Sequence, residues 1–390
     1  MHADKRDIDV NSRYETMIQP KVFIDRLLAG GVSFFAGVPD SLLKNLCAYI
    51  TDNIARENNI IAANEGGAVA LAAGYHLATG KTGCVYMQNS GEGNAVNPLL
   101  SLMDADVYNM PLLLVIGWRG EPGVHDEPQH VKQGKVTLSL LQTMGIPYVV
   151  LDESWEEQVD EALRVIKETN GIYALIVRKG TFADYQLQNQ ISSLLPLGRE
   201  EAIKIVVDKL RKDDIVVSTT GMISRELFEY REAKRQGHAH DFLTVGSMGH
   251  ASQIALGIAL QKPNRRVIVF DGDGALLMHM GGMAIIGDYN PKNFVHIVFN
   301  NGAHDSVGGQ PTVGQKIDME TIAKAVGYTD VVSVDNEMAL CCAMNHVNNA
   351  DVEGTSFINV NVRKGNRKDL GRPTTTPQQN KEALMKELLK

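Results

Sequence analysis

Strand-like runs alternate with helix-length segments along most of this chain. Apolar runs such as PLLLVIG, YALIVRKG, RRVIVFDGDG and VHIVFNNG are separated by stretches long enough to form helices. This alternation is typical of β–α–β units, in which helices join parallel strands and cover both faces of the sheet. We therefore predict an α/β protein built on doubly wound parallel sheets.

A weak internal repeat indicates that this architecture occurs twice. The tetrapeptide VRKG occurs at residues 177–180 and again at 362–365, an offset of 185. Two similar apolar segments align Gly74 with Gly257, an offset of 183. Landmarks that recur in the same order at nearly constant spacing indicate two domains of similar topology. A length of 390 residues is also too great for one core of ordinary size.

The domain boundaries follow from where the strand pattern stops. Residues 181–197 lack a strand pattern and are rich in Gln and Ser, so we expect a linker there. The predicted domains are a first one over residues 1–180 and a second one over residues 198–365. Residues 366–390 form a C-terminal extension, and the short linker leaves no room for a middle domain.

Charge and hydropathy exclude several classes of partner. The formal net charge of −8 argues against nucleic acid, and an anionic substrate would need a local cluster of cations. The longest apolar run is far shorter than the ~20 residues that cross a bilayer. The N-terminus has no signal-like apolar core, and the four cysteines show no CxxC spacing. We expect a cytoplasmic protein that binds neither nucleic acid nor membrane.

Two neighbouring strand-like runs end in polar residues. The first ends in Asp271–Gly274 (DGDG) and the second in Asn300–Gly302 (NNG), with the 25 residues 275 to 299 between them. That spacing fits one helix and one strand, so both ends are expected at the same carboxyl edge of a parallel sheet. Asp273, Asn301 and a main-chain carbonyl near Ala303 would form an oxygen-only set suited to Mg²⁺. The alternative is a pair of tight turns, which Asp, Asn and Gly also favour.

This pattern resembles the diphosphate-binding motif of thiamine-diphosphate enzymes, GDG followed about 25 residues later by N or NN. The resemblance implies that thiamine diphosphate and Mg²⁺ are the cofactors, with Asp273, Asn301 and the Ala303 main-chain oxygen as metal ligands. His304 and Asp305 fall where members of that family place residues facing the thiazolium ring. The resemblance also implies that the residues of these two turns bind the cofactor: Gly272, Asp273, Gly274, Ala275, Asn301, Ala303 and His304.

A second stretch, AANEGGAVALAAGYHLATG, resembles the segment of these enzymes that supplies one glutamate to the cofactor's pyrimidine ring. The resemblance implies that Glu65 both binds the cofactor and takes part in catalysis, because a carboxylate there favours the reactive tautomer of the ring. The alternative is an acid at the start of a helix that merely complements the helix dipole.

Three further segments resemble cofactor-binding parts of the family. In DFLTVGSMGHA, Met248 takes the place of the apolar residue that supports the bent cofactor, with Ser247 beside it, although Met248 could equally be a core residue. STTGM resembles the turn that touches the diphosphate and the pyrimidine, which implies roles for residues 220–222 (Thr220, Gly221 and Met222). MQNSGEGNA resembles a pyrimidine-domain loop that contains Ser90, but Glu92 stands where the family usually has proline.

The pattern is most similar to the phosphonopyruvate decarboxylase family, in stretches such as FFAGVPDSLLKNLC, LLLVIGWRGEPGVHDEPQH and VFNNGAHDSVGGQPT. The resemblance implies decarboxylation of 3-phosphonopyruvate to phosphonoacetaldehyde and CO₂, in phosphonate biosynthesis. It also implies a homodimer or higher homo-oligomer with active sites at the subunit interface. Sulfopyruvate decarboxylase is the next closest family and remains an alternative, as does a non-catalytic cofactor-binding protein.

Four further residues are candidates for catalysis. Arg119 follows the apolar run LLLVI and could grip a phosphonate through two parallel N–H bonds, unless it is a solvated loop residue. His125 and His130 lie in the same loop and could deliver a proton or bind an anion, but structural roles are equally compatible. Ser41, in GVPDS, matches the position of a polar catalytic residue in related decarboxylases.

Overall fold

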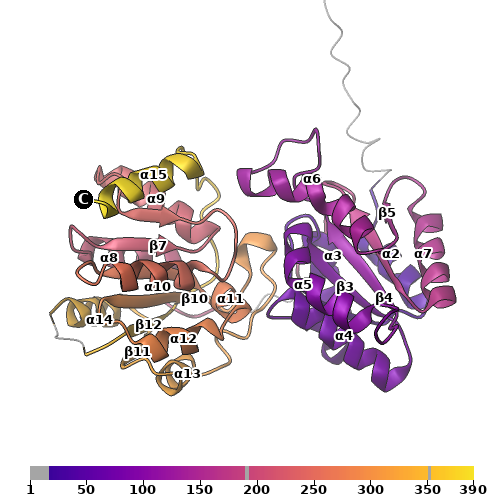
Figure 1. Cartoon of the computed structure of the whole chain (residues 1–390), viewed down its shortest axis with the longest axis horizontal. Coiled ribbons are helices and arrows are strands. Elements are labelled where there is room, and N and C mark those ends of the chain that lie inside the picture. The colour runs from indigo at the N-terminus through magenta and orange to yellow at the C-terminus, as the bar shows by residue number, and fades with distance from the viewer. Residues whose placement is uncertain (1–16, 189–192, 350–352) are drawn as a thin grey trace, which may run out of the picture. The chain divides into compact units, whose positions relative to one another are not determined.

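The computed structural model describes residues 17–188, 193–349 and 353–390. The described residues form two compact units, the first comprising residues 17–188 together with 307–310 and the second the other described residues. Each unit has its own sheet (Figure 1). Each also has its own hydrophobic core. Within the described ranges, no helix is long and apolar enough to cross a membrane.

The first unit is built on a parallel sheet whose strand order is β2-β1-β3-β4-β6-β5. The bounds of the strands are β1 (Phe34–Gly37), β2 (Asn59–Ile61), β3 (Gly83–Gln88), β4 (Leu112–Gly117), β5 (Tyr148–Val150) and β6 (Ile172–Val177). The helices are α2 (Pro20–Ala29), α3 (Lys44–Asn53), α4 (Glu65–Thr79), α5 (Glu92–Pro98), α6 (Pro128–Thr143) and α7 (Trp155–Thr169). Short helical turns are η1 (Arg56–Asn58), η2 (Asn89–Gly91) and η3 (Leu99–Met103).

The central strand β4 is buried along its whole length because both of its faces carry apolar side chains. Successive side chains of a strand point to opposite faces. Leu112 and Leu114 accordingly join one core cluster, while Leu113 and Val115 join the other. A strand with apolar residues at every position is what helices on both faces of a sheet require.

The second unit repeats this design with the strand order β11-β12-β10-β9-β7-β8. Its strands are β7 (Ile215–Ser218), β8 (Asp241–Leu243), β9 (Val267–Gly272), β10 (Phe294–Asn300), β11 (Asp330–Val334) and β12 (Ser356–Asn361). Its helices are α8 (Arg199–Lys209), α9 (Met222–Lys234), α10 (Ala251–Gln261), α11 (Asp273–Met278), α12 (Gly282–Tyr289), α13 (Met319–Ala325), α14 (Glu337–Asn349) and α15 (Pro377–Leu388).

The two sheets have the same topology. When the strands of each unit are numbered in chain order, both sheets run 2-1-3-4-6-5. The prediction of two doubly wound parallel-sheet domains of similar topology is therefore confirmed. In each sheet the winding reverses between strands 1 and 3, and the loops at the carboxyl ends of these strands are where α/β sheets usually bind ligands.

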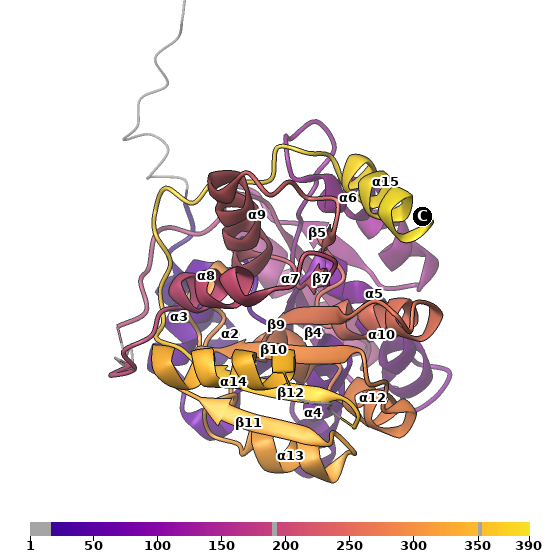
Figure 2. The same cartoon turned by 90° about the vertical axis from the view of Figure 1, so that its left-hand side faces the viewer.

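After β12 the chain runs back along the second unit to α15, drawn in yellow in Figure 2, which contacts the edge strand β8. The helix begins with a capping box in which Thr376 and Gln379 satisfy each other's backbone N–H groups. Asn380 is buried against the edge strand β8, where it donates to the Asp241 carbonyl and accepts from the Leu243 N–H. The C-terminal residues thus cover one edge of the second sheet.

Candidate functional site

The ends of β9 and β10 meet at one edge of the second sheet. The two strands are parallel neighbours, and Gly272 pairs in register with Phe299. Asp273, the first residue of α11, therefore lies beside Asn301, which directly follows β10. The Asp273 side chain is only 3% exposed, and its carboxylate accepts hydrogen bonds from the Thr312 hydroxyl and the Asn301 N–H.

Burial raises the pKa of Asp273 to about 6, and these hydrogen bonds counteract only part of that rise. The partners are a hydroxyl and backbone amides, which carry no positive charge to balance an ionised carboxylate. A divalent cation at this position would supply that charge and favour the ionised form. The environment of Asp273 therefore fits a metal ligand.

Asn301 presents its amide in a defined orientation. Its Nδ2 donates to Asp305 at 2.7 Å, and its Oδ1 accepts from the Ala303 N–H at 3.0 Å. Gly302, between them, has a φ of 67°, a left-handed conformation that glycine adopts without strain. In the described part of the chain, no group of three or more His, Cys, Asp or Glu could hold a metal ion. The donors at this edge are instead one carboxylate, one amide and the main chain, a set that fits Mg²⁺.

Met248 and His304 gather over Gly274 in the first turn of α11. A Cβ atom at Gly274 would lie 3.0 Å from the His304 ring and 3.4 Å from the Met248 methyl group. Burial lowers the pKa of His304 to about 4, so its ring is neutral near pH 7. Ala275 is buried beside them, and Gly272 precedes the helix as its N-cap.

The loop after β7 lies next to this edge because β7 pairs with β9. Gly221 has a φ of 95° and forms the N-cap of α9, which begins at Met222. The Thr220 hydroxyl donates to the Val245 carbonyl at 2.8 Å, so it holds the loop that leads to Met248. Ser247, in that second loop, is exposed and also has a positive φ, of 53°.

In the first unit, Glu65 is enclosed at the start of α4. Its side chain is 5% exposed, and it accepts a hydrogen bond from Asn94 at 2.8 Å. A Cβ atom at Gly91 would lie 2.3 Å from the Glu65 carboxylate, so a larger residue there would displace this carboxylate. Asn64 caps the helix by accepting from the Gly67 N–H at 2.8 Å. The close approach of Gly91, the hydrogen bond from Asn94 and the cap of α4 together hold this carboxylate in place.

Glu92 is a buried acid whose environment the sequence did not reveal. It is 2% exposed, and its Oε1 has no hydrogen-bond partner among the described residues. Burial raises its pKa to about 8, so it is largely protonated at neutral pH. The departure from the family's usual proline pointed to this position, but only the packing around it shows that the carboxyl group is enclosed.

Arg119 follows β4 and is already paired with an acid. Its guanidinium donates to Asp126 through Nε at 2.8 Å and Nη2 at 2.5 Å, and through Nη1 to the Ser41 hydroxyl at 2.6 Å. Burial opposes ionisation of Asp126, but the hydrogen bonds from Arg119 hold the pKa of Asp126 well below its usual value. Binding of an anion by Arg119 therefore requires Asp126 to move or to share the guanidinium.

A chain of hydrogen bonds joins the ends of β1 and β3 beside this pair. The buried carboxylate of Asp40 accepts from the backbone N–H groups of Leu42 and Leu43 and from Gln88 at 2.6 Å. Ser90 is exposed and donates to the other end of the Gln88 amide at 2.7 Å. Asp40 thus organises the turn that carries Ser41.

The two loop histidines occupy different environments. His125 is exposed in the loop between β4 and α6, whereas His130 is buried in the first turn of α6. The structure therefore does not place them in one cluster, and a catalytic role for either stays a prediction.

Comparison with known proteins agrees with this geometry. Residues 20–140 match the model of the thiamine pyrophosphate enzyme N-terminal TPP binding domain, and residues 219–360 match the corresponding C-terminal TPP binding domain. A phosphonopyruvate decarboxylase from Streptomyces viridochromogenes is 34% identical over 89% of this chain and 89% of its own length.

Two more relatives extend this comparison. A phosphonopyruvate decarboxylase from Streptomyces hygroscopicus is 34% identical over 93% of this chain and 92% of its own length. A sulfopyruvate decarboxylase from Methanosarcina acetivorans is 29% identical over 86% of this chain and 89% of its own length. The chain belongs to the phosphonopyruvate decarboxylase family of thiamine pyrophosphate enzymes.

Proposed function

We propose that this protein decarboxylates 3-phosphonopyruvate to phosphonoacetaldehyde and CO₂, with thiamine diphosphate and Mg²⁺ as cofactors. Two relatives named phosphonopyruvate decarboxylase match the chain over about nine tenths of their length, which supports the reaction. The observation that carries the proposal is the buried carboxylate of Asp273, which lies beside Asn301 and whose hydrogen-bond partners among the described residues are neutral.

The second unit would hold the diphosphate end of the cofactor. Asp273, Asn301 and the main-chain oxygen of Ala303 are the proposed ligands of Mg²⁺, and residues 220–222 and 272–275 line the same sheet edge. The other proposed contacts with the cofactor are Ser247, Met248 and His304 in this unit and Ser90 in the first unit. When bound, the cofactor supplies an electron sink for the pair of electrons released as the carboxylate leaves.

The first unit would supply an acid and a cation. We assign to Glu65 the exchange of a proton with the pyrimidine ring, because its carboxylate is enclosed and held by Asn94. We assign to Arg119 and Ser41 the binding of the substrate's phosphonate, with Asp126 as the counter-ion when no substrate is bound. Glu65 of one subunit would serve the cofactor held by its partner, so we infer a homodimer or higher homo-oligomer.

Sulfopyruvate is the second candidate substrate because a sulfopyruvate decarboxylase is 29% identical over most of the chain. A sulfonate carries one negative charge and a phosphonate up to two. The positive charge that contacts this group therefore determines which of the two substrates binds more tightly. The test is CO₂ release from each substrate at saturating thiamine diphosphate and Mg²⁺. We expect kcat/KM for 3-phosphonopyruvate to be at least about tenfold higher, equivalent to ~1.4 kcal/mol.

Each alternative has its own outcome in this experiment. A higher kcat/KM for sulfopyruvate would reassign the substrate. Cofactor binding without CO₂ release from either compound would instead indicate a non-catalytic cofactor-binding protein.

A further inference from the structure

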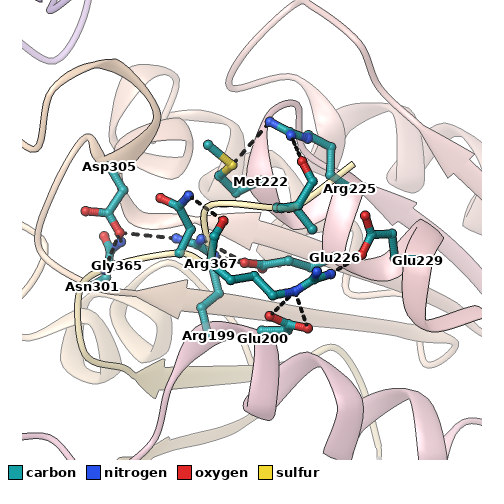
Figure 3. A network of polar contacts seen from close by, with 12 residues as sticks. Arg199, Glu200, Met222, Arg225, Glu226, Glu229, Asn301, Asp305, Gly365 and Arg367 are labelled. Carbon is teal, nitrogen blue, oxygen red and sulfur yellow. Dashed lines mark hydrogen bonds and ion pairs between the residues drawn. The ribbon is translucent and has the colours of Figure 1, made fainter. Parts of the chain in front are cut away.

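A network of polar contacts in the second unit joins Asn301 to residues far from it in the sequence (Figure 3). Asp305 accepts hydrogen bonds from three other residues of this network. Its Oδ2 accepts from Asn301 Nδ2 at 2.7 Å, from the Gly365 N–H at 2.9 Å and from Arg199 Nη1 at 3.4 Å. Asp305, which the family resemblance places among the residues facing the thiazolium ring, thus has its Oδ2 occupied by protein donors.

Asp305 is held in place by a buried ion pair. Arg199 is 5% exposed and makes two hydrogen bonds of 2.9 Å with Glu226, which is itself buried. Two parallel bonds between a guanidinium and a carboxylate fix the plane of the guanidinium. The third guanidinium nitrogen, Nη1, is therefore held beside Asp305.

The contact with Asp305 also fixes which end of the Asn301 amide faces which neighbour. A carboxylate can only accept a hydrogen bond, and the Ala303 N–H can only donate one. Turning the Asn301 amide over would set its NH₂ group against the Ala303 N–H and its oxygen against Asp305, which would cost both bonds. In the observed orientation, Oδ1 keeps a second lone pair for a cation.

The chain after β12 takes part in the same network. Gly365 supplies one of the three donors to Asp305. The following residues are tied down by the ion pairs of Arg367 with Glu200 and Glu229, and by hydrogen bonds from Arg225 to the carbonyls of Leu370 and Gly371 (Figure 3). These contacts keep Gly365 beside Asp305.

We propose that Asp305 is a positioning residue for the metal site, which fixes the Asn301 amide with its oxygen available to the divalent ion. This inference rests on the proposed function, in which Asn301 is a ligand of Mg²⁺. It assigns part of the metal affinity to a carboxylate that does not touch the metal. Partners that orient a ligand in this way commonly contribute 10–100-fold to metal affinity.

The test measures metal dependence without using turnover. Thiamine diphosphate is titrated into the protein by calorimetry at a series of Mg²⁺ concentrations, and the concentration that gives half of the maximal cofactor binding is determined. We expect this concentration to rise roughly 10–100-fold in Asp305→Ala. The rise should be smaller in Asp305→Asn, because an amide oxygen can still accept from Asn301.

Asp214→Asn is the matched control. Asp214 is buried in the same unit and pairs with Arg266 at the amino ends of β7 and β9, away from the proposed metal ligands. Its loss also breaks a buried ion pair, so it should lower stability and leave the Mg²⁺ requirement unchanged. Thermal unfolding shows which variants are folded, and if Asp305→Ala is not, Asp305→Asn provides the comparison.

Two results would overturn the positioning role. One is an unchanged Mg²⁺ requirement in both folded Asp305 variants, and the other is an equal rise in Asp214→Asn. A wild-type protein that shows no Mg²⁺-dependent heat with thiamine diphosphate would instead overturn the proposed function itself.

Discussion

Each unit has a buried acid after the third strand of its sheet, but the hydrogen-bond partners of the two acids differ. Strand 3 of the first sheet leads through η2 to Glu92, and strand 3 of the second leads to Asp273. Asp273 receives hydrogen bonds from a hydroxyl and backbone amides, whereas Glu92 Oε1 receives none among the described residues. Their pKa values are accordingly about 6 and about 8. Hydrogen-bond donors, rather than depth of burial, distinguish the acid that suits a cation from the acid that stays protonated.

The loops after strand 2 differ in a similar way. In the first unit this loop leads to Glu65, and in the second it carries Met248. One half of the repeat thus offers a carboxylate where the other offers an apolar side chain. This difference matches the proposed division of roles, with proton exchange in the first unit and metal and diphosphate binding in the second.

The largest expected effect is that of Glu65→Gln, which should lower turnover but leave cofactor binding intact. Glu65→Gln keeps the shape of the side chain but removes the carboxylate, so kcat for CO₂ release should fall by roughly 10²–10⁴-fold. The heat of thiamine diphosphate binding should remain. Glu57→Gln, at an exposed position of the same unit, is the control and should be unaffected. An unchanged kcat in Glu65→Gln would contradict the role given to the first unit.

The second prediction concerns the proposed metal site of the second unit. Asp273→Ala removes the proposed carboxylate ligand, so cofactor affinity in the presence of Mg²⁺ should fall more than about 100-fold, beyond the usual effect of outer-shell partners. Calorimetry with thiamine diphosphate measures this loss. Asp288→Ala, which changes an exposed acid of α12, should bind normally. If Asp273→Ala retained the wild-type heat, the metal site would have to lie elsewhere.

Glu92 provides a prediction about pH. Its pKa is about 8 in the folded protein against an ordinary value of 4.5, so the folded state binds the proton more tightly than the unfolded state does. Stability conferred by this proton is complete below pH 4.5 and is lost as the pH rises towards 8. The Tm of the cofactor-free protein should therefore fall over this range.

The variant Glu92→Gln should remove part of that fall. At pH 8 we expect it to be more stable than the wild type by roughly 1–3 kcal/mol, because Gln is neutral at every pH whereas burial opposes the ionisation of Glu92. Thermal unfolding followed by circular dichroism between pH 5 and 8 measures both curves. Parallel curves for the two proteins would show that Glu92 does not carry the effect.

The smallest expected effect compares one helix cap in each unit. Asn64 caps α4 and Asp318 caps α13, each through a side chain that accepts from a backbone N–H. Replacing either by alanine should cost about 0.5–2 kcal/mol, measured as a lower Tm. Only Asn64→Ala should also lower kcat, because the cap precedes Glu65 directly. Equal kcat values in the two variants would mean that the cap does not position the acid.

The alternation of strands and helices and the internal repeat were sufficient to predict the fold, because both reflect periodic burial. The 25-residue spacing (275 to 299) also predicted that the stretches around Asp273 and Asn301 end neighbouring strands, and the β9–β10 pairing agrees with this. Once a parallel sheet is assumed, this adjacency follows from the length of one helix and one strand.

The polar partners could not be predicted in the same way. The bond between Asp305 and Arg199 joins residues 106 positions apart, and no periodic pattern marks it. Asp126 lies only seven positions from Arg119, but the irregular loop between them gives no rule for which side chains meet. The enclosure of Glu92 depends on packing around η2 and α5. Ion pairs and single buried acids are properties of the assembled unit.

The two hydrogen bonds between Asn380 and β8 have a practical consequence for handling the protein. An edge strand whose N–H and C=O groups are uncovered can recruit a strand from another molecule. Cutting the chain before α15 would expose the groups of Asp241 and Leu243 that Asn380 now satisfies. Versions that lack α15 should therefore self-associate at high concentration.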